Sequence, residues 1–285
     1  MEDKFVQVGQ VRTRYRTLGD QGSTVILLHG IARSLEDWSE NMRALSSLHR
    51  VFALDLVGFG LSDKPDLPYS VPFLAGFVRQ FMQTLGLEPA VLMGNSMGGA
   101  VALELAFSNP GMVEALVLAA PAGIGPKGAK WLAWCSVPIV GELIAQPSRA
   151  GTERIQKSLF ANPDFFTPER ITRDFELAVQ PGATKAFLKT LRSMANYNGV
   201  RSSLYEPTLE RLGLLKIPTL IVWGVQDHVL PVEYAPVAHA KIPNSELEMY
   251  DPCGHFPMLE RSDEFNARVL AFLQSRVTRN QEITR

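Results

Sequence analysis

Residues 90–107 read AVLMGNSMGGAVALELAF, and this stretch decides the fold. A short apolar run leads into Gly94-Asn95-Ser96-Met97-Gly98, and a segment of good helix formers follows it. Small residues on both sides of Ser96 allow a sharp turn between a strand and a helix, which would push the serine hydroxyl outward. We therefore expect Ser96 to act as a nucleophile. The alternative is a tight glycine turn that holds a serine by chance.

A serine hydroxyl needs a base within hydrogen-bond reach to react near neutral pH, and histidine most often supplies it. The chain has five histidines, of which His255 follows the last expected strand in the sequence Cys253-Gly254-His255. A loop in that position reaches the edge of the sheet where parallel strands end. We expect His255 to be the general base, against the alternative of a surface or helix-cap histidine.

The imidazole of such a base is usually held in one tautomer by a carboxylate. Asp227 follows the apolar run 219–223 and would lie at the same edge of the sheet. Asp251 is the rival, but it stands only four residues before His255 and is more typical of a turn residue. We favour Asp227 as the residue that orients His255.

Negative charge that develops on an attacked carbonyl oxygen needs two hydrogen-bond donors, and loss of one typically costs about 3 kcal/mol in the barrier. The turn at Ser96 positions the backbone NH of Met97. The loop after the apolar run 24–28 offers the NH of Ile31 as the second donor. His29 in the same loop is then expected to support the loop rather than to exchange protons.

The rest of the sequence alternates short apolar runs with segments of helical period. Residues 5–18 predict an antiparallel hairpin that turns at residues 9–10. Runs rich in Val, Ile and Leu, typical of strands covered on both faces, occupy residues 24–28, 50–54, 90–93, 115–119, 219–223 and 246–250. Helical segments lie near residues 35–46, 73–85, 97–108, 232–240 and 263–274. This order predicts an α/β fold with a mostly parallel, eight-stranded sheet and helices on both faces.

The alternation breaks once, between about residues 125 and 209. This stretch contains amphipathic helical pieces but no convincing strand. We expect an all-helical cap inserted into the sheet and acting as a lid. The expected division is therefore a core in two parts, residues 1–124 and 210–285, with the cap at residues 125–209.

Charge and cysteine usage limit the classes of partner. The formal net charge is −1, from 28 basic and 29 acidic side chains, so no long-range field favours nucleic acid or an anionic membrane. A neutral small molecule fits this balance best. Cys135 and Cys253 show no metal-type pairing, and residues 1–10 hold no apolar run typical of a signal peptide. We expect a cytoplasmic protein with reduced thiols, either a monomer or a homodimer, without metal or cofactor.

The most apolar stretch, residues 131–145, is interrupted by Pro138 and Gly141 and is too short to span a bilayer. It is expected to be a packed helix or part of the lid. We do not expect stable membrane association, which is the alternative interpretation of this stretch.

The order Ser96, Asp227, His255 resembles that of the α/β-hydrolase superfamily, over residues 5–274. The motifs that carry the resemblance are His29-Gly30 after a strand, DLVGFGLSD at 55–63, GNSMGG at 94–99, WGVQD at 223–227 and Gly254-His255-Phe256. The superfamily implies the fold expected above and a hydrolytic activity. Relatives with an aspartate nucleophile are disfavoured because residue 96 is serine.

Within the superfamily the chain resembles meta-cleavage product hydrolases, which split carbon–carbon bonds in vinylogous diketones, and small bacterial carboxylesterases. GNSMGG at 94–99 and DEFN at 263–266 are similar to the former. The resemblance fails at residues 31–34 (IARS) and 38–40 (WSE), where those hydrolases carry a glycine-rich stretch and an asparagine. When the chain is aligned with that family, Asp174 falls near the position of the family's lid arginine. Phe256 falls where the family has a tryptophan.

We therefore expect a carboxylic-ester hydrolase that forms an acyl-enzyme, with a small-molecule ester as substrate. Carbon–carbon bond hydrolysis is the first alternative, a haloperoxidase-like side activity is conceivable on the same triad, and a non-catalytic binding module is the alternative from another class. Trp38, Leu230 and Phe256 are expected to line the substrate pocket, together with Ile31 and Met97. A basic pocket for an anionic substrate could use Arg33, Arg173 or Arg192, but these are expected to be solvated charges.

Overall fold

The computed structural model describes residues 1–283, and the side chains of residues 1–275. Its centre is an eight-stranded sheet in the order β1-β2-β4-β3-β5-β6-β9-β10, in which only β2 runs against the other strands. The strands are β1 (Lys4–Val8), β2 (Val11–Leu18), β3 (Thr24–Leu28), β4 (Arg50–Leu54), β5 (Ala90–Asn95), β6 (Val113–Ala119), β9 (Thr219–Gly224) and β10 (Ser245–Tyr250). The predicted hairpin, the six predicted strands and the mostly parallel sheet are all confirmed.

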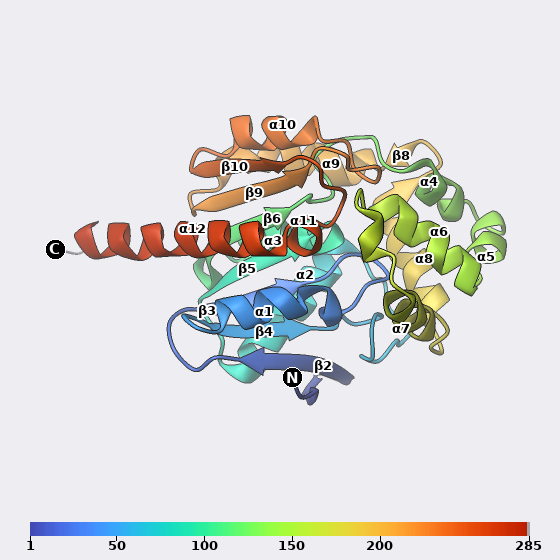
Figure 1. The fold of residues 1–285 in the computed structure, drawn as a ribbon, viewed down its shortest axis with the longest axis horizontal. Coiled ribbons are helices and arrows are strands. Elements are labelled where there is room, and N and C mark those ends of the chain that lie inside the picture. Colours follow the sequence, from blue (N-terminus) through green and yellow to red (C-terminus); the bar gives the residue numbers. More distant parts are fainter. Residues whose placement is uncertain (284–285) are drawn as a thin grey trace.

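Helices cover both faces of this sheet (Figure 1). On one face, α1 (Ser39–Leu45) packs against α12 (Ser262–Ile283), and on the other α2 (Val71–Leu85) packs against α3 (Met97–Ser108). Helix α10 (Tyr234–Lys241) contacts β9 and β10. The segment predicted as one helix near residues 35–46 is a 3-10 helix, Leu35–Trp38, followed by α1. No helix in the described part of the chain is long and apolar enough to cross a membrane.

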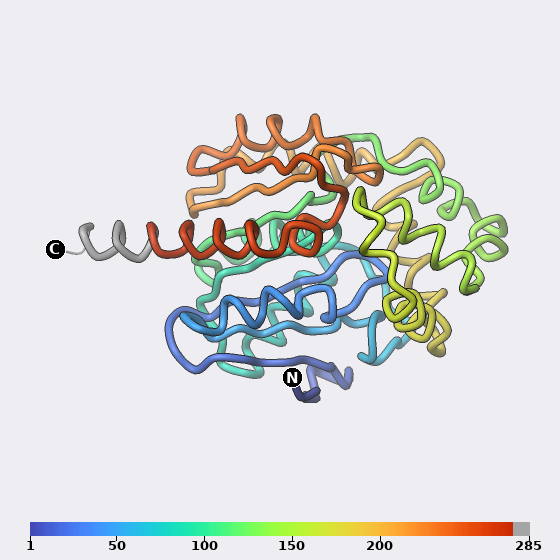
Figure 2. The backbone as a smooth tube through the Cα atoms, viewed as in Figure 1, coloured from blue at the N-terminus to red at the C-terminus, as the bar shows by residue number. Residues whose placement is uncertain are grey.

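The chain between β6 and β9 forms a separate group of helices beyond the carboxyl ends of the parallel strands (Figures 1 and 2). These helices are α4 (Lys130–Ser136), α5 (Val140–Ile144), α6 (Arg149–Leu159), α7 (Pro168–Ala178) and α8 (Ala183–Met194), and α9 (Ser202–Arg211) then packs against α3. The expectation of an all-helical insertion is wrong in one respect, because β7 (Ala195–Asn196) and β8 (Gly199–Val200) pair antiparallel. Strands of two residues have no readable periodicity. The cap boundaries at residues 125 and 209 stay a prediction.

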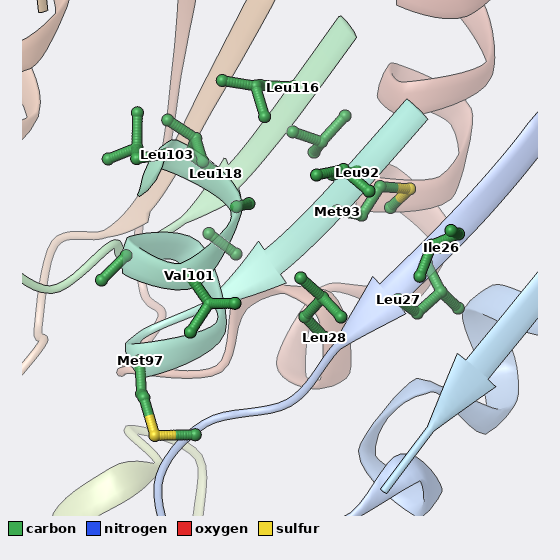
Figure 3. Packing of buried hydrophobic residues seen from close by; sticks show 14 of the residues in the cluster. Ile26, Leu27, Leu28, Leu92, Met93, Met97, Val101, Leu103, Leu116 and Leu118 are labelled. Carbon is green, nitrogen blue, oxygen red and sulfur yellow. The ribbon is translucent and has the colours of Figure 1, made fainter. Parts of the chain in front are cut away.

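The core lies around the three central strands. Strands β3 and β5 are buried along their whole length, which explains why their sequences are apolar without alternation. Figure 3 shows side chains of β3, β5 and β6 packed together with Val101 and Leu103 of α3. Since this core fixes α3 against the ends of β3 and β5, it also fixes the turn that joins β5 to α3.

The turn between β5 and α3 is too crowded for any residue but glycine at two positions. A Cβ on Gly98 would lie 2.2 Å from the carbonyl oxygen of Leu28, and one on Gly94 would lie 2.3 Å from the carbonyl oxygen of Gly98. Both obstacles are backbone atoms, which cannot rotate away. The first turn of α3 therefore lies directly against the end of β3.

We expect Gly98→Ala to lower the free energy of unfolding by about 1–3 kcal/mol or more, because the added methyl group forces the backbone of β3 and α3 apart. The matched control is Gly76→Ala in the middle of α2, where an added Cβ meets nothing within 4 Å. Alanine there should stabilise the protein by about 0.5–1 kcal/mol, because it restricts the unfolded chain. Urea unfolding of both variants checks the pair. Equal effects of the two substitutions would contradict the close approach.

Candidate active site

Ser96 lies at the sharp turn between β5 and α3 in a strained backbone conformation. Its φ is 55° and its ψ is −117°, which non-glycine residues rarely adopt. The turn is held by the Ser96 amide, which donates to the carbonyl of Ala119 at 3.0 Å, and by the Ala122 amide, which donates to the carbonyl of Ser96 at 3.0 Å. Such strain costs about 1–3 kcal/mol and persists only where the surrounding structure enforces it. Ser96 is 9% exposed.

His255 and Asp227 form a buried pair at the carboxyl edge of the sheet. His255 Nδ1 lies 2.7 Å from Asp227 Oδ2, and their side chains are 3% and 0% exposed. The other carboxylate oxygen, Oδ1, accepts hydrogen bonds from the amides of Val229 and Leu230 at 2.7 and 2.9 Å. With both oxygens engaged, the carboxylate cannot rotate. It directs the proton to Nδ1 and leaves Nε2 as the basic nitrogen.

The rival carboxylate, Asp251, does not contact the histidine. It is exposed, and its Oδ1 accepts a hydrogen bond from Gln226 Nε2 at 2.7 Å. Gln226 in turn accepts from the amide of Cys253 at 2.8 Å. Asp251 therefore helps to fix the loop that carries His255, as expected of a turn residue.

Asn95 connects the turn at Ser96 to the loop at His255. Its Nδ2 donates to the carbonyls of Ala119 and His255, each at 3.1 Å. Ser96 and His255 also line the same cavity, although no hydrogen bond joins the two side chains in the described residues. Catalytic hydrogen bonds are often long in unliganded enzymes and shorten when the substrate binds.

The two predicted oxyanion donors lie together beside Ser96. Ile31 and Met97 line one small cavity with Ser96. In the described part of the chain neither amide donates a hydrogen bond to another group, and Met97 is the first residue of α3, where amides have no partner within the helix. Both donors are therefore available to a ligand.

His29 supports the loop that carries Ile31. It is fully buried, its Nδ1 lies 2.7 Å from the carbonyl oxygen of Gly30, and its Nε2 accepts from the Leu56 amide at 3.0 Å. These partners indicate a neutral ring with the proton on Nδ1. Burial also lowers the pKa of His29, which favours the same neutral form. The structural function predicted for His29 fits this geometry.

Two cavities meet at Ser96. The smaller has a volume of about 60 Å³, and apart from Ser96 its walls are apolar, with Ile31, Leu132 and Leu230 among them. The larger has a volume of about 570 Å³ and is lined by Ser96, His255, Phe256 and residues of α4, α6 and α7. Of the two cavities, His255 lines only the larger. The insertion contributes to the walls of both cavities, with Leu132 of α4 in the smaller one and residues of α4, α6 and α7 in the larger.

The prediction that Trp38 lines the substrate pocket is wrong for these two cavities. Its side chain is fully buried and packs against Phe265 of α12 with the ring centroids 6.3 Å apart. The 3-10 helix that ends at Trp38 turns this side chain into the core. Leu230 and Phe256, in contrast, line the smaller and the larger cavity respectively.

The prediction of solvated arginines fails at Arg33. Its side chain is 9% exposed and forms ion pairs with Asp37 and Asp174. Arg173 is 28% exposed, and Arg192, at 27%, pairs with Glu142. The sequence pattern could not distinguish Arg33 because its partner Asp174 is 141 residues away.

Glu260 is a further residue of the site that sequence reasoning missed. Its Oε1 accepts from the Gly254 amide at 2.7 Å, next to His255. Its Oε2 accepts from the amides of Ala161 and Asn162 at 2.8 and 2.9 Å, at the end of α6. One carboxylate therefore joins the histidine loop to the insertion. The His255 amide reinforces this junction by donating to the carbonyl of Leu159 at 2.7 Å.

Burial makes both cysteines of the chain poor nucleophiles. Cys135 and Cys253 are both buried and unpaired with each other, and burial raises the pKa of both thiols. Among residues 1–275, no group of three or more His, Cys, Asp or Glu side chains is arranged to hold a metal ion.

Comparison with known proteins identifies the family. The sequence pattern of the alpha/beta hydrolase fold family matches residues 23–262. The chain belongs to this family. The superfamily predicted from the motifs and the fold predicted from the sequence are thereby confirmed, and the protein is a hydrolase of the alpha/beta fold.

This α/β hydrolase has relatives of more than one activity. The 2-hydroxy-6-oxo-6-(2'-aminophenyl)hexa-2,4-dienoic acid hydrolase of Metapseudomonas resinovorans is 30% identical over 287 residues, which cover 99% of this chain and 93% of the relative. The meta-cleavage product hydrolase of Pseudomonas fluorescens superposes with a TM-score of 0.82 at 26% identity, covering 95% and 97% of the two chains. A putative lipase of Acinetobacter baumannii superposes with a TM-score of 0.87 at 25% identity, covering 98% and 92%.

Proposed function

We propose that this α/β hydrolase is a serine carboxylesterase that cleaves small to medium apolar esters through an acyl-enzyme, with Ser96, His255 and Asp227 as its catalytic residues. The observation that carries the proposal is that His255, paired at 2.7 Å with the buried side chain of Asp227, lines the same cavity as Ser96. A structural ion pair has no need of a strained serine beside it. The two available amides of Ile31 and Met97 add the donors that acyl transfer requires.

In the first half of the reaction Ser96 Oγ attacks the ester carbonyl and His255 Nε2 takes its proton. The carbonyl oxygen becomes an oxyanion, which accepts hydrogen bonds from the amides of Ile31 and Met97. Asp227 stabilises the imidazolium that forms. When the tetrahedral intermediate collapses, the carbon–oxygen bond of the ester breaks and His255 returns the proton to the leaving alcohol.

In the second half, water attacks the acyl-enzyme. His255 Nε2 takes a proton from the water, the same two amides stabilise the new oxyanion, and the bond between Ser96 and the acyl carbon breaks as His255 protonates Ser96 Oγ. The products are a carboxylic acid and the free serine. Water is the only co-reactant that the two steps consume.

We assign the two halves of the ester to the two cavities. His255 must reach the leaving oxygen to protonate it, and of the two cavities His255 lines only the larger. The alcohol group therefore occupies the larger cavity and the acyl group the smaller. A cavity of about 60 Å³ with apolar walls suits a short, uncharged acyl chain.

Carbon–carbon bond hydrolysis of meta-cleavage products is the second candidate. The similarity to hydrolases of that activity, at 30% and 26% identity, favours it. The sequence departs from their pattern at residues 31–34 and at Phe256, and Arg33, the buried arginine of the larger cavity, is already paired with carboxylates. Ester hydrolysis demands only the features described above, so we place it first.

We expect a fluorophosphonate probe to label the wild-type protein and to leave Ser96→Ala unlabelled, because only an activated serine reacts with it. Ser108→Ala, at the exposed end of α3, is the matched control and should label as fast as wild type. His255→Ala should slow labelling by about 10²-fold or more, because the base is lost. Gel fluorescence and mass spectrometry of the labelled peptide measure these rates. Undiminished labelling of Ser96→Ala would overturn the proposal.

Among p-nitrophenyl esters, we expect kcat/KM to be highest at an acyl length of about four carbons and to fall at least about tenfold by eight carbons, because the acyl group lies in the smaller cavity, whose volume is about 60 Å³. Leu230→Ala enlarges the smaller cavity and should move the optimum to longer chains. A steady rise toward eight carbons in wild type would contradict the acyl assignment. Bleaching of a meta-cleavage dienoate faster than hydrolysis of every ester would favour the second candidate.

A further inference from the structure

A buried ionic cluster lines the larger cavity beside His255. Arg33 donates from Nε and Nη2 to the two carboxylate oxygens of Asp37, at 2.8 and 2.7 Å. Its remaining nitrogen, Nη1, donates to Asp174 Oδ2. Arg33 and Asp174 both line the cavity, with side chains that are each 9% exposed. The guanidinium also lies 5.2 Å from the centre of the Phe256 ring. In the described residues, each of the three guanidinium nitrogens of the only buried arginine in the cavity wall thus donates to a carboxylate.

The two carboxylates that pair with Arg33 come from different parts of the fold. Asp37 belongs to the 3-10 helix after β3, its side chain is 1% exposed, and it does not line the cavity. Asp174 belongs to α7 in the insertion and also accepts from Gln156 Nε2 of α6 at 2.6 Å. Asp37 therefore fixes the position of Arg33, while Asp174 is the carboxylate that faces the cavity.

The residues that contact one another in this cluster carry no net charge. Arg173 donates to Asp174 Oδ1 from Nε and Nη2, at 3.1 and 3.0 Å, and lies 3.6 Å from Asp37 Oδ1. Two arginines thus meet two aspartates. Arg170 is close enough to act on the cluster electrostatically, but its guanidinium lies over the rings of Phe160 and Phe165 and does not line the cavity.

Burial alone would lower the pKa of the Arg33 guanidinium, but the charges of Asp174 and Asp37 outweigh it and raise that pKa. The guanidinium of Arg33 therefore stays charged across the ordinary pH range. Two other cations line the larger cavity. Lys64 Nζ donates to the carbonyls of Gly60 and Ser62 at 2.8 and 3.0 Å, and Arg154 is exposed.

We propose that Asp174 is a specificity-determining residue, which neutralises Arg33 in the larger cavity and thereby selects esters with uncharged alcohol groups over esters whose alcohol group carries a carboxylate. The assignment rests on the proposed ester hydrolysis, and it names the substrate class of that site. A carboxylate that enters this cavity loses water and finds the buried arginine occupied, so its desolvation is not compensated. An uncharged group loses nothing comparable.

The substitution Asp174→Asn tests the effect of the Asp174 charge, because it removes that charge and keeps the size of the side chain. Asparagine keeps the shape of the side chain and an oxygen that can accept from Arg33 Nη1, while its amide nitrogen replaces Oδ1 and ends the two hydrogen bonds from Arg173. Asp37 still holds Nε and Nη2, so Arg33 keeps its position. The cluster then carries one net positive charge at the cavity wall. An anionic alcohol group gains a partner, while an uncharged group is unaffected.

The test uses two butanoate esters of equal size, 3-(butanoyloxy)benzoate and 3-(butanoyloxy)benzamide. Their acyl groups are identical, so only the group in the larger cavity changes. The measured quantity is the ratio of kcat/KM for the benzoate to kcat/KM for the benzamide, in which any general loss of activity cancels. Glu176→Gln is the matched control, because it makes the same charge change at an exposed position of α7 outside the cavity. Circular dichroism shows that each variant is folded.

In wild type we expect a ratio of about one tenth or less, and in Asp174→Asn a rise of about tenfold or more, a change of about 1.4 kcal/mol. Glu176→Gln should stay within about twofold of wild type, because surface charges act weakly. Asp174→Glu, which restores the charge, should return the ratio toward the wild-type value.

An unchanged ratio in folded Asp174→Asn would overturn the assignment.

A wild-type enzyme that hydrolyses both esters equally well would overturn it too. In that case, loss of the benzoate activity in Lys64→Met would identify Lys64 as the residue that binds the carboxylate. Should Asp174→Asn fail to fold, the wild-type ratio alone decides. If wild type hydrolyses the benzamide ester, the proposed function holds whatever the ratio; if it hydrolyses neither ester, the proposed function fails and the assignment fails with it.

Discussion

The close packing of the first turn of α3 against the end of β3 is the constraint on which the site depends. Gly98 lies so near the carbonyl of Leu28 that a side chain cannot fit, and this contact keeps the first turn of α3, directly after Ser96, against β3. Ser96 has a positive φ in this turn, and the Met97 amide, at the first position of α3, has no partner in the described structure. The cost of this conformation is about 1–3 kcal/mol, which the buried strands β3, β5 and β6 offset by their packing. The strained conformation of Ser96 therefore depends on the packing of these strands.

The histidine side of the site is held from three directions. Asp227 fixes the ring, Asn95 fixes the His255 carbonyl relative to the turn at Ser96, and Glu260 fixes the loop relative to the insertion. The insertion is consequently connected to the loop that carries His255. A displacement of α6 would be transmitted to His255 through the Leu159 carbonyl and Glu260. Binding in the larger cavity, which α6 and α7 line, can in this way influence the position of His255.

The sequence predicted the parts of the site that depend on local chemistry. The turn at Ser96, the available amides beside it and the choice of Asp227 over Asp251 all follow from glycine spacing and from the ends of buried strands. Trp38 was misplaced because periodicity shows that a residue is apolar, but not whether it faces a cavity or the core. Arg33 was expected to be solvated and Glu260 was missed for another reason: their partners at residues 174 and 161–162 are remote in sequence, and no local pattern records a contact over such distances. The paired strands β7 and β8 are too short to leave a pattern.

The central claim is that Ser96 forms a covalent acyl intermediate with an ester substrate. The direct measurement is mass spectrometry of protein quenched in acid during turnover of p-nitrophenyl butanoate, followed by digestion and fragmentation of the modified peptide. The account predicts the added mass of one butanoyl group on the peptide that contains Ser96, and fragments that assign it to that side chain. Turnover of the ester with no acyl adduct on Ser96, or with the adduct on a cysteine, would contradict the account.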